Sequence, residues 1–217
     1  MKAGPTGNRE AALTKLEVLV VVAVLILLGF LLLQRIARRN DRSSQVICWA
    51  NLHKITLAFN QWALDHDGKF PAQVSVTKGG SKEFVATGEV FRHFQLLSNS
   101  LITPAVLVCP ADKPRQAAGA FTGAVSNTNL SYFVNVDAGD TMSSALVTGD
   151  RNLTNGSLLP NRIMELKSDS VVGWTAEMHH LQGNVGLLDG SVQTFSTPEM
   201  RRAVNSLGTT TDRLAIP

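Results

Sequence analysis

Several side chains in this sequence are of types that could do chemistry. Carboxylates and imidazoles, which are common zinc ligands, gather in the last quarter of the chain at Glu177, His179, His180 and Asp189. The two histidines are adjacent, so alternation along an extended strand would turn them to opposite faces. The sequence also contains no G-x-S-x-G pattern that would indicate a nucleophile elbow. We therefore expect polar residues beside a turn, with no catalytic residue and no metal ligand.

Hard oxygen ligands occur in two other places. Asp137 lies near Asp140, and Asp150 lies near Asn152 and Asn155. Calcium prefers such oxygen ligands, but the same residues commonly form Asx turns in loops. We expect no cofactor, and calcium stays an alternative.

The chain has two cysteines, Cys48 and Cys109. Cys48 falls on an apolar helical stripe, and Cys109 precedes a proline, so both fit ordinary packing positions. A disulfide between them is the other interpretation. It would close a loop of about sixty residues and stabilise the fold by about 4 kcal/mol in the chain-entropy model. The sequence leaves both interpretations open.

A long N-terminal helix must carry the first cysteine. Residues 18–33 contain no charged side chain and would form roughly 24 Å of helix, which residues 13–17 extend to a full membrane span. This extension places the Glu17 carboxylate inside the apolar zone, at a cost on the order of 3 kcal/mol at mid-bilayer and less near its edge. The helix should end near Asp67-Gly68. Before that end it continues with a stripe of apolar residues at steps of three and four, which are Cys48, Leu52, Ile55, Phe59 and Trp62.

The second half of the chain predicts a small antiparallel sheet. Four segments have strand character between turn residues: 131–136, 145–148, 171–176 and 184–195. The last contains Asp189-Gly190, a strong hairpin signal, and a two-residue turn there would pair Leu187 with Val192 and Val185 with Thr194. Residues 106–110 predict a further short strand, and Thr197 an N-cap before a last helix. The fold class is therefore α+β, with a long helix packed on a small sheet.

The residues before the apolar run resemble the processing site of type IV prepilins and type II secretion pseudopilins. The stretch is Ala12-Leu13-Thr14-Lys15-Leu16-Glu17-Val18, with Ala and Leu where the family usually has Gly and Phe around the cut. The resemblance implies cleavage between Ala12 and Leu13, methylation of Leu13, and a role for Glu17 in assembly. Nine residues separate His179 from Asp189-Gly190, which is similar to the H-x9-DG motif of many prepilin-type proteins.

The resemblance also implies an organisation and a function. Residues 1–12 would be the leader, 13–34 the transmembrane part of the helix, 35–67 its amphipathic part, and 68–217 a globular pilin-like domain. The chain would be a structural subunit of a pseudopilus or pilus, anchored in the inner membrane by a single pass with its domain on the periplasmic side. Its implied partners are a prepilin peptidase, other pilin-like subunits and an inner-membrane assembly platform.

Charge bears on the partners and on the orientation. Residues 1–42 hold seven Lys/Arg and three Asp/Glu, which leaves 13 basic against 14 acidic residues in the remainder. A nearly neutral domain has no electrostatic footprint for nucleic acid, so we expect none as a partner. The four arginines after the apolar run favour a cytoplasmic domain, whereas the resemblance favours the opposite side, which we adopt. The alternative is a signal-anchored periplasmic binding or enzymatic domain that uses the helix only as a tether.

Overall fold

The computed structural model describes residues 15–123, 125–139, 146–155, 157–206 and 211–217. By its internal contacts the chain divides into two compact units, Met1–Arg42 and Ser43–Pro217. The predicted leader and the predicted cleavage site at Ala12 and Leu13 lie outside the described residues.

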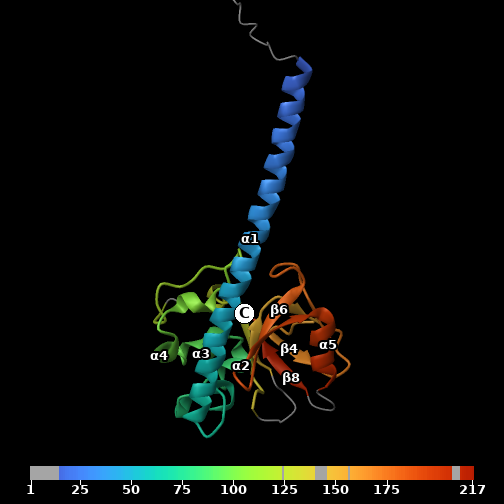
Figure 1. Cartoon of the computed structure of the whole chain (residues 1–217). Helices are drawn as coiled ribbons and strands as arrows, with labels where there is room; N and C mark the ends of the chain where they lie inside the picture. The colour runs from blue at the N-terminus through green and yellow to red at the C-terminus, as the bar shows by residue number, and fades with distance from the viewer. Residues whose placement is uncertain (1–14, 124, 140–145, 156, 207–210) are drawn as a thin grey trace, which may run out of the picture. The chain divides into compact units, whose positions relative to one another are not determined.

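Helix α1 is Lys15–Leu64, 50 residues long (Figure 1). Its first part, Lys15–Leu33, is long and apolar enough to cross a membrane, and none of it is buried. Within the second unit the predicted stripe is confirmed. Cys48, Leu52, Ile55 and Phe59 have no exposed surface, and Trp62 is partly buried against the same core. The predicted end of the helix is also close to the observed one. Asp67 and Gly68 both have positive φ, and the Gly68 N–H donates to the Ala63 carbonyl.

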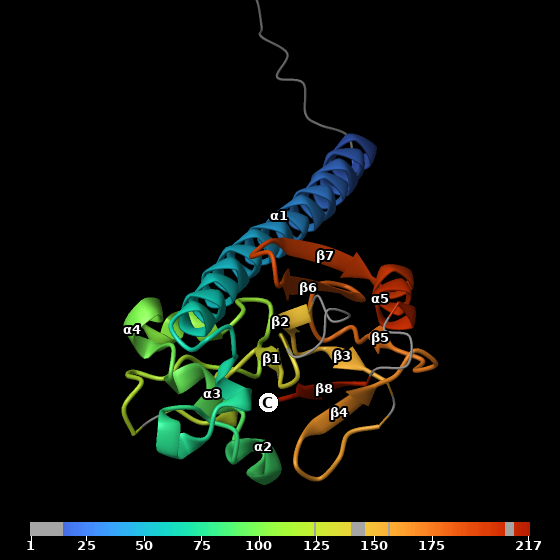
Figure 2. The ribbon, with the colours of Figure 1, turned by 90° about the horizontal axis from the view of Figure 1, so that it is seen from below.

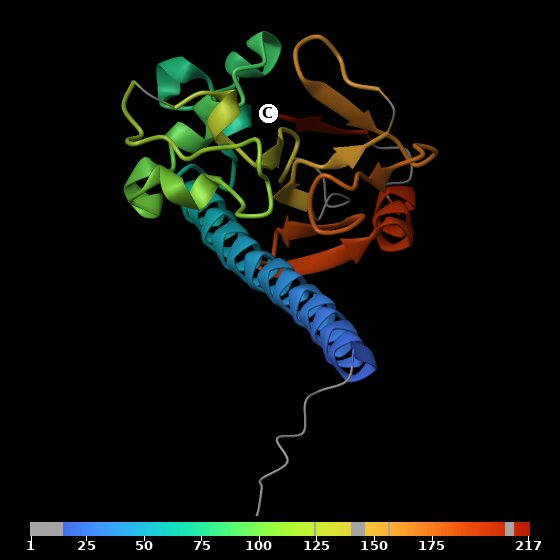
Figure 3. The same cartoon turned by 90° about the horizontal axis from the view of Figure 1, so that it is seen from above.

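Short helical segments follow α1 and lie together on one side of the second unit, as Figures 2 and 3 both show. Val90, Phe94 and Leu97 are buried there. The segments are η1 Pro71–Gln73, η2 Val76–Lys78, α2 Phe84–Thr87, α3 Phe91–Gln95, α4 Ser98–Leu101, η3 Pro104–Leu107 and η4 Asn127–Asn129.

The other side of this unit is a six-stranded sheet with the order β4-β8-β1-β2-β6-β7, joined by antiparallel pairings. A separate two-stranded ribbon pairs β3 with β5. This confirms the α+β class. The strands are β1 Tyr132–Asn135, β2 Leu146–Asp150, β3 Leu153–Thr154, β4 Ile163–Leu166, β5 Gly173–Trp174, β6 Gln182–Leu187, β7 Val192–Ser196 and β8 Asp212–Ala215.

Alternation along the strands gives the sheet two apolar faces. Tyr132 and Val134 belong to the core that contains the α1 stripe, whereas Phe133 between them belongs to a second core with Met200 and Val204. The last two residues lie on α5 Thr197–Asn205. The sheet is therefore covered on one face by α1 and on the other by α5. Close contact with α1 requires glycine at 186, where a Cβ would overlap the Thr56 hydroxyl.

The hairpin predicted at Asp189-Gly190 is present, but its register is wrong by one residue. Gly186 pairs with Val192 and Asn184 with Thr194, instead of Leu187 with Val192 and Val185 with Thr194. The Leu187 N–H donates to Ser191 O, and Gly190, at φ 86°, donates back to Leu187 O. The loop thus has three residues with glycine in the left-handed position. The extra loop residue shifts the pairing by one, so the side chains of one strand face the opposite side from the one expected relative to its partner.

Two further expectations are wrong. Residues 106–110 do not form a strand, because the Thr103 hydroxyl caps the 3-10 helix η3 and Pro104 occupies its first turn. The N-cap of α5 is Ser196, whose hydroxyl and N–H both donate to the Glu199 carboxylate, rather than Thr197. The strands β3, β4 and β8 were not predicted; β3 has only two residues, and β4 and β8 have four residues each.

Candidate metal centre

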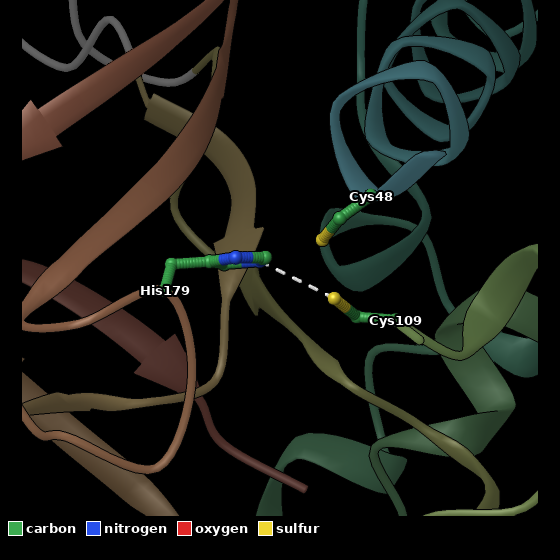
Figure 4. Close-up of side chains that lie close together, drawn as sticks. All are labelled: Cys48, Cys109 and His179. Carbon is green, nitrogen blue, oxygen red and sulfur yellow. Dashed lines mark hydrogen bonds between the residues drawn. The ribbon is translucent and has the colours of Figure 1, made fainter. Parts of the chain in front are cut away.

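Three segments far apart in the sequence bring two cysteine thiols and one histidine imidazole close together. Cys48 points inward from α1, Cys109 follows η3, and His179 precedes β6. Figure 4 shows the two sulfur atoms and the imidazole ring directed toward one another. Their ligand atoms all lie within 4.8 Å of one another. All three residues belong to the second unit, so the cluster is a property of that unit alone.

The Asp150 carboxylate at the end of β2 joins this cluster. The Cys48 thiol donates to Asp150 Oδ1 at 3.1 Å, and His179 Nε2 lies 3.5 Å from Asp150 Oδ2. The same Nε2 lies 3.2 Å from Cys109 Sγ. One imidazole nitrogen therefore faces both a sulfur and a carboxylate, and the other carboxylate oxygen faces the second sulfur.

Neighbouring donors stabilise the negative groups of the cluster. Asn184 donates to Asp150 Oδ2 from its backbone N–H at 2.6 Å and from its side-chain amide at 3.0 Å. The Tyr132 hydroxyl lies 3.4 Å from Cys48 Sγ. Asp150, Asn184 and Tyr132 all have no exposed surface. A carboxylate without water must be satisfied by such bonds, because an unpaired buried charge is strongly destabilising.

An unusual backbone segment holds His179 in place. His179, His180 and Leu181 have φ values of 49°, 51° and 64°, a left-handed region that non-glycine residues rarely occupy. The Asn152 side-chain amide donates to the carbonyls on both sides of this segment, Met178 O at 3.1 Å and Gln182 O at 3.2 Å. Left-handed non-glycine residues persist only where their surroundings fix them, and they concentrate at functional sites.

Burial and mutual contact shift the pKa values of the cluster. Burial raises the pKa of Asp150 to about 7 and that of Cys48 well above its usual range. The hydrogen bond with Cys48 lowers the pKa of Cys109 to about 6, and the contact with His179 acts in the same direction. Burial opposes protonation of His179, but the contacts with Cys109 and Asp150 outweigh it and raise its pKa. The thiols, the imidazole and the carboxylate thus share protons as one system.

This set of groups has two chemical uses. Two thiols and one imidazole, with a carboxylate beside them, are the ligand types that bind Zn²⁺ and related ions. A cysteine beside a histidine could also act as a nucleophile. However, Cys109 has no exposed surface and the His179 side chain is 2% exposed, so the described arrangement offers a substrate no access. The geometry favours binding over catalysis.

Comparison with known proteins identifies no relative. No protein-family model matches the chain, and neither a curated protein nor a solved structure matches it. The resemblance to prepilins therefore stays a prediction that depends on the quoted residues alone.

The structure brings some of the predicted site residues together and separates others. Cys48 and Cys109 are both free thiols with neighbouring sulfur atoms, so their pairing as a disulfide stays a prediction. The two parts of the H-x9-DG motif lie at opposite ends of β6, with His179 in the cluster and Asp189-Gly190 in the hairpin turn. Asp189 Oδ1 accepts from the Ser191 N–H, so this carboxylate shapes its own turn.

The hairpin turn contacts α1 through hydrogen bonds from three side chains of the helix. His53 Nδ1 lies 3.1 Å from Gly190 O, Asn60 donates to Leu188 O, and the Trp49 indole donates to Val192 O. The Asp-Gly half of the motif thus positions β6 and β7 against α1.

The other ligand sets considered from the sequence are used differently. Glu177 forms an ion pair with Arg151 at 2.9 Å, and His180 is exposed. Asp137 is held by two hydrogen bonds from the Arg213 guanidinium, Asn155 donates to Glu165 O, and Asp140 lies outside the described residues. Calcium at these positions stays an untested alternative, and each described carboxylate named here already has a partner in the fold.

The sequence did not reveal the role of Asp150 or the cluster as a whole. Asp150 follows an apolar strand, where a carboxylate normally begins a solvated turn. Its burial depends on Asn184 and on Cys48, which lie 34 and 102 residues away along the chain. The two cysteines together with His179 were the only signal, and their spacing alone does not indicate contact.

Proposed function

We propose that this chain is a pilin-like structural subunit that is inserted in the inner membrane by α1 and assembles helix against helix into a pseudopilus or pilus. The observation that carries the proposal is the segment Lys15–Leu33 of α1, which is 19 residues long, apolar apart from Lys15 and Glu17 at its start, and not buried. In water such a surface would be strongly unfavourable, whereas lipid or neighbouring identical helices would cover it.

The second part of α1 also supports assembly. On the second unit Val46, Ile47, Leu57 and Leu64 are exposed on the helix although its opposite stripe is buried. Large apolar side chains that are exposed along one helix favour contact with another protein surface. In the proposed filament, these residues would meet the α1 helices of neighbouring subunits.

The remaining elements of the proposal come from the resemblance. A prepilin peptidase would cut between Ala12 and Leu13, Leu13 would be methylated, and the second unit would lie on the periplasmic side. Glu17, in the first turn of α1, would then stand close to the new N-terminus. Intact-mass measurement of the membrane-purified chain tests this step, because the cut form lacks the mass of residues 1–12.

Cysteine cross-linking tests assembly. Val21→Cys and Leu28→Cys, made separately, should give disulfide-linked homo-oligomers in cells that carry a prepilin peptidase and an assembly platform. Val171→Cys is the matched control, because Val171 is 71% exposed but belongs to the second unit and is not a residue of α1. The unaltered chain controls for links through Cys48 and Cys109. Monomers only at positions 21 and 28, with an uncut N-terminus, would contradict the proposal and favour the tethered domain.

A further inference from the structure

The buried cluster of Cys48, Cys109 and His179 consists of side chains that can bind a metal ion, although apolar side chains would be enough to fill the same space. Cys48, Cys109 and His179 come from three segments, and their sulfur and nitrogen atoms all lie within 4.8 Å of one another. Cysteine and histidine are the residues that most often form structural zinc sites in proteins. We propose that these three residues bind a zinc-class divalent ion that ties α1 to the sheet side of the second unit.

The observed distances fit a tetrahedral site. Zn–S bonds of about 2.3 Å and Zn–N bonds of about 2.1 Å place neighbouring ligand atoms roughly 3.6 Å apart. Cys109 Sγ and His179 Nε2 are 3.2 Å apart, and the remaining separations are at most 4.8 Å. Shifts of a few tenths of an ångström to one ångström, which rotation of the cysteine side chains can supply, would complete three corners of the tetrahedron.

Asp150 is the fourth ligand in this proposal. Its Oδ1 lies 3.1 Å from Cys48 Sγ and its Oδ2 lies 3.5 Å from His179 Nε2, so it borders two of the three corners. Asn184 donates twice to Oδ2, which orients the carboxylate and leaves Oδ1 available once the Cys48 thiol is deprotonated. Hydrogen bonds of this kind commonly orient the ligands of zinc sites.

The charges balance on binding. Both cysteines bind as thiolates and His179 as a neutral imidazole, so the protons that these three groups hold pass to solvent, and the two thiolates neutralise the dication with no change of oxidation state. The Asp150 carboxylate then leaves one net negative charge, which the amide donors of Asn184 and the Tyr132 hydroxyl stabilise. No oxidant or further reactant is needed.

A metal ion accounts for more of the cluster than a disulfide does. A bond between the two sulfur atoms would give neither the His179 imidazole nor the Asp150 carboxylate a role, although both are buried in the interior. It would also not explain why three left-handed residues, held by Asn152, direct His179 toward Cys109. Coordination uses all four side chains and places the cation beside the buried carboxylate.

The test uses the full chain, purified in detergent under argon with a phosphine reductant. Titration with Co²⁺ should give one equivalent bound, with a sulfur-to-cobalt charge-transfer band that Zn²⁺ then abolishes. His179→Gln and Cys109→Ser should each weaken Zn²⁺ binding more than about 100-fold, since even outer partners of zinc ligands contribute 10- to 100-fold. His180→Gln is the matched control and should bind as the unaltered chain does.

Three results would overturn the proposal. The first is a reduced, unaltered chain that gives no charge-transfer band with Co²⁺, a measurement that does not depend on any variant folding. The second is equal binding by the His179→Gln and His180→Gln variants. The third is recovery of a Cys48–Cys109 disulfide from acid-quenched cells with thiols trapped at lysis. None of these results bears on cleavage or on filament assembly, so the site and the proposed function are tested separately.

Discussion

Two regions of this protein depart from the usual distribution of polar and apolar residues in opposite directions. The segment Lys15–Leu33 is apolar and none of it is buried. In the second unit, Asp150, Asn184 and Asp112 are polar and at most 2% exposed. The first region leaves apolar surface that needs a covering from outside the chain. The second region holds polar groups that are satisfied by partners within the chain.

The difference shows what each region depends on. Exposed apolar surface costs roughly 25 cal/mol per Å² in water, and only lipid or another helix can remove that cost. Buried carboxylates cost several kcal/mol each unless hydrogen bonds or cations replace water. Changing the first region should therefore affect membrane insertion and assembly, whereas changing the second should affect folding. The following predictions test this separation.

The largest effect is expected from charges in the apolar segment. Val24→Asp combined with Leu28→Asp should weaken insertion by about 6 kcal/mol, because each aspartate costs about 3 kcal/mol at the centre of a membrane helix. Alkaline extraction of membranes should then release the chain. Leu57→Asp combined with Leu64→Asp, also on α1 but in the second unit, is the control and should leave the chain in the membrane. Release of both double variants would show that Lys15–Leu33 is not the anchor.

The next effect concerns a buried ion pair. Arg151 donates two hydrogen bonds of 2.7 Å to the Asp112 carboxylate, whose side chain is 1% exposed. Arg151→Leu should lower the free energy of unfolding by about 3 to 5 kcal/mol, because it leaves an uncompensated buried charge. Urea unfolding of the full chain in detergent, followed by tryptophan fluorescence, measures this change.

A second arginine provides the matched control for the buried pair. Arg213 also donates two hydrogen bonds to one carboxylate, that of Asp137, but the arginine side chain is 48% exposed. Arg213→Leu should cost at most about 1 kcal/mol, as exposed ion pairs do. Equal losses for Arg151→Leu and Arg213→Leu would show that burial is not the deciding factor.

A smaller effect should appear as a pH dependence. His93 has no exposed surface, its Nδ1 lies 2.7 Å from the Ser81 hydroxyl, and burial lowers its pKa to about 4. The unfolded chain, with a histidine pKa near 6.5, binds this proton first as the pH falls. Stability should therefore decrease between pH 6.5 and pH 4, by about 3 kcal/mol at most, and this contribution should not change further below pH 4.

His93→Gln isolates this contribution. The glutamine cannot titrate, so its unfolding free energy should fall less steeply than that of the unaltered chain across the same pH window. His66→Gln is the control, because His66 lies in the turn after α1 and is partly exposed. Its unfolding free energy should fall with pH as steeply as that of the unaltered chain. If the His93→Gln and unaltered chains have parallel pH profiles, the His93 imidazole does not remain neutral on folding.

Much of the fold could be predicted because it depends on local patterns. The α1 stripe at Cys48, Leu52, Ile55 and Phe59 follows helical periodicity, and the Asp67-Gly68 stop follows backbone chemistry. Asp189-Gly190 correctly predicted the hairpin, but the predicted pairing of its two strands was wrong by one residue. A two-residue and a three-residue loop share the same Asp-Gly signal, and the backbone hydrogen bonds between Leu187 and Ser191 and from Gly190 to Leu187 show that the loop has three residues.

The candidate site could be predicted only in part, for a physical reason. A disulfide between Cys48 and Cys109 was one of two open interpretations, and His179 was noted within a motif but set aside as a metal ligand. Asp150 was assigned to a solvated loop, because a carboxylate after an apolar strand usually faces water. Its actual burial depends on hydrogen bonds from residues distant in the sequence, which no local pattern encodes.

The smallest effect on folding is expected from Glu17→Gln, a substitution inside the segment Lys15–Leu33 that tests whether its carboxylate has a role in assembly. Glu17 lies in the first turn of α1 and is exposed. A neutral amide is less costly in lipid than a carboxylate, so insertion and the unfolding free energy of the second unit should not decrease. In the proposed filament, however, the carboxylate lies beside the Leu13 amino group of a neighbouring subunit, and an opposite charge within about 4 to 6 Å keeps it ionised.

Loss of this charge should therefore weaken assembly while folding stays intact. Cross-links through Val21→Cys should decrease in the Glu17→Gln background, whereas extraction and urea profiles should match those of the unaltered chain. Ala12→Glu should block cleavage, leave the mass of residues 1–12 on the chain and give the same loss of cross-links, because the amino group at Leu13 never forms. Full cross-linking by Glu17→Gln would instead place this residue at the membrane edge with no role between subunits, since long polar side chains there can reach water.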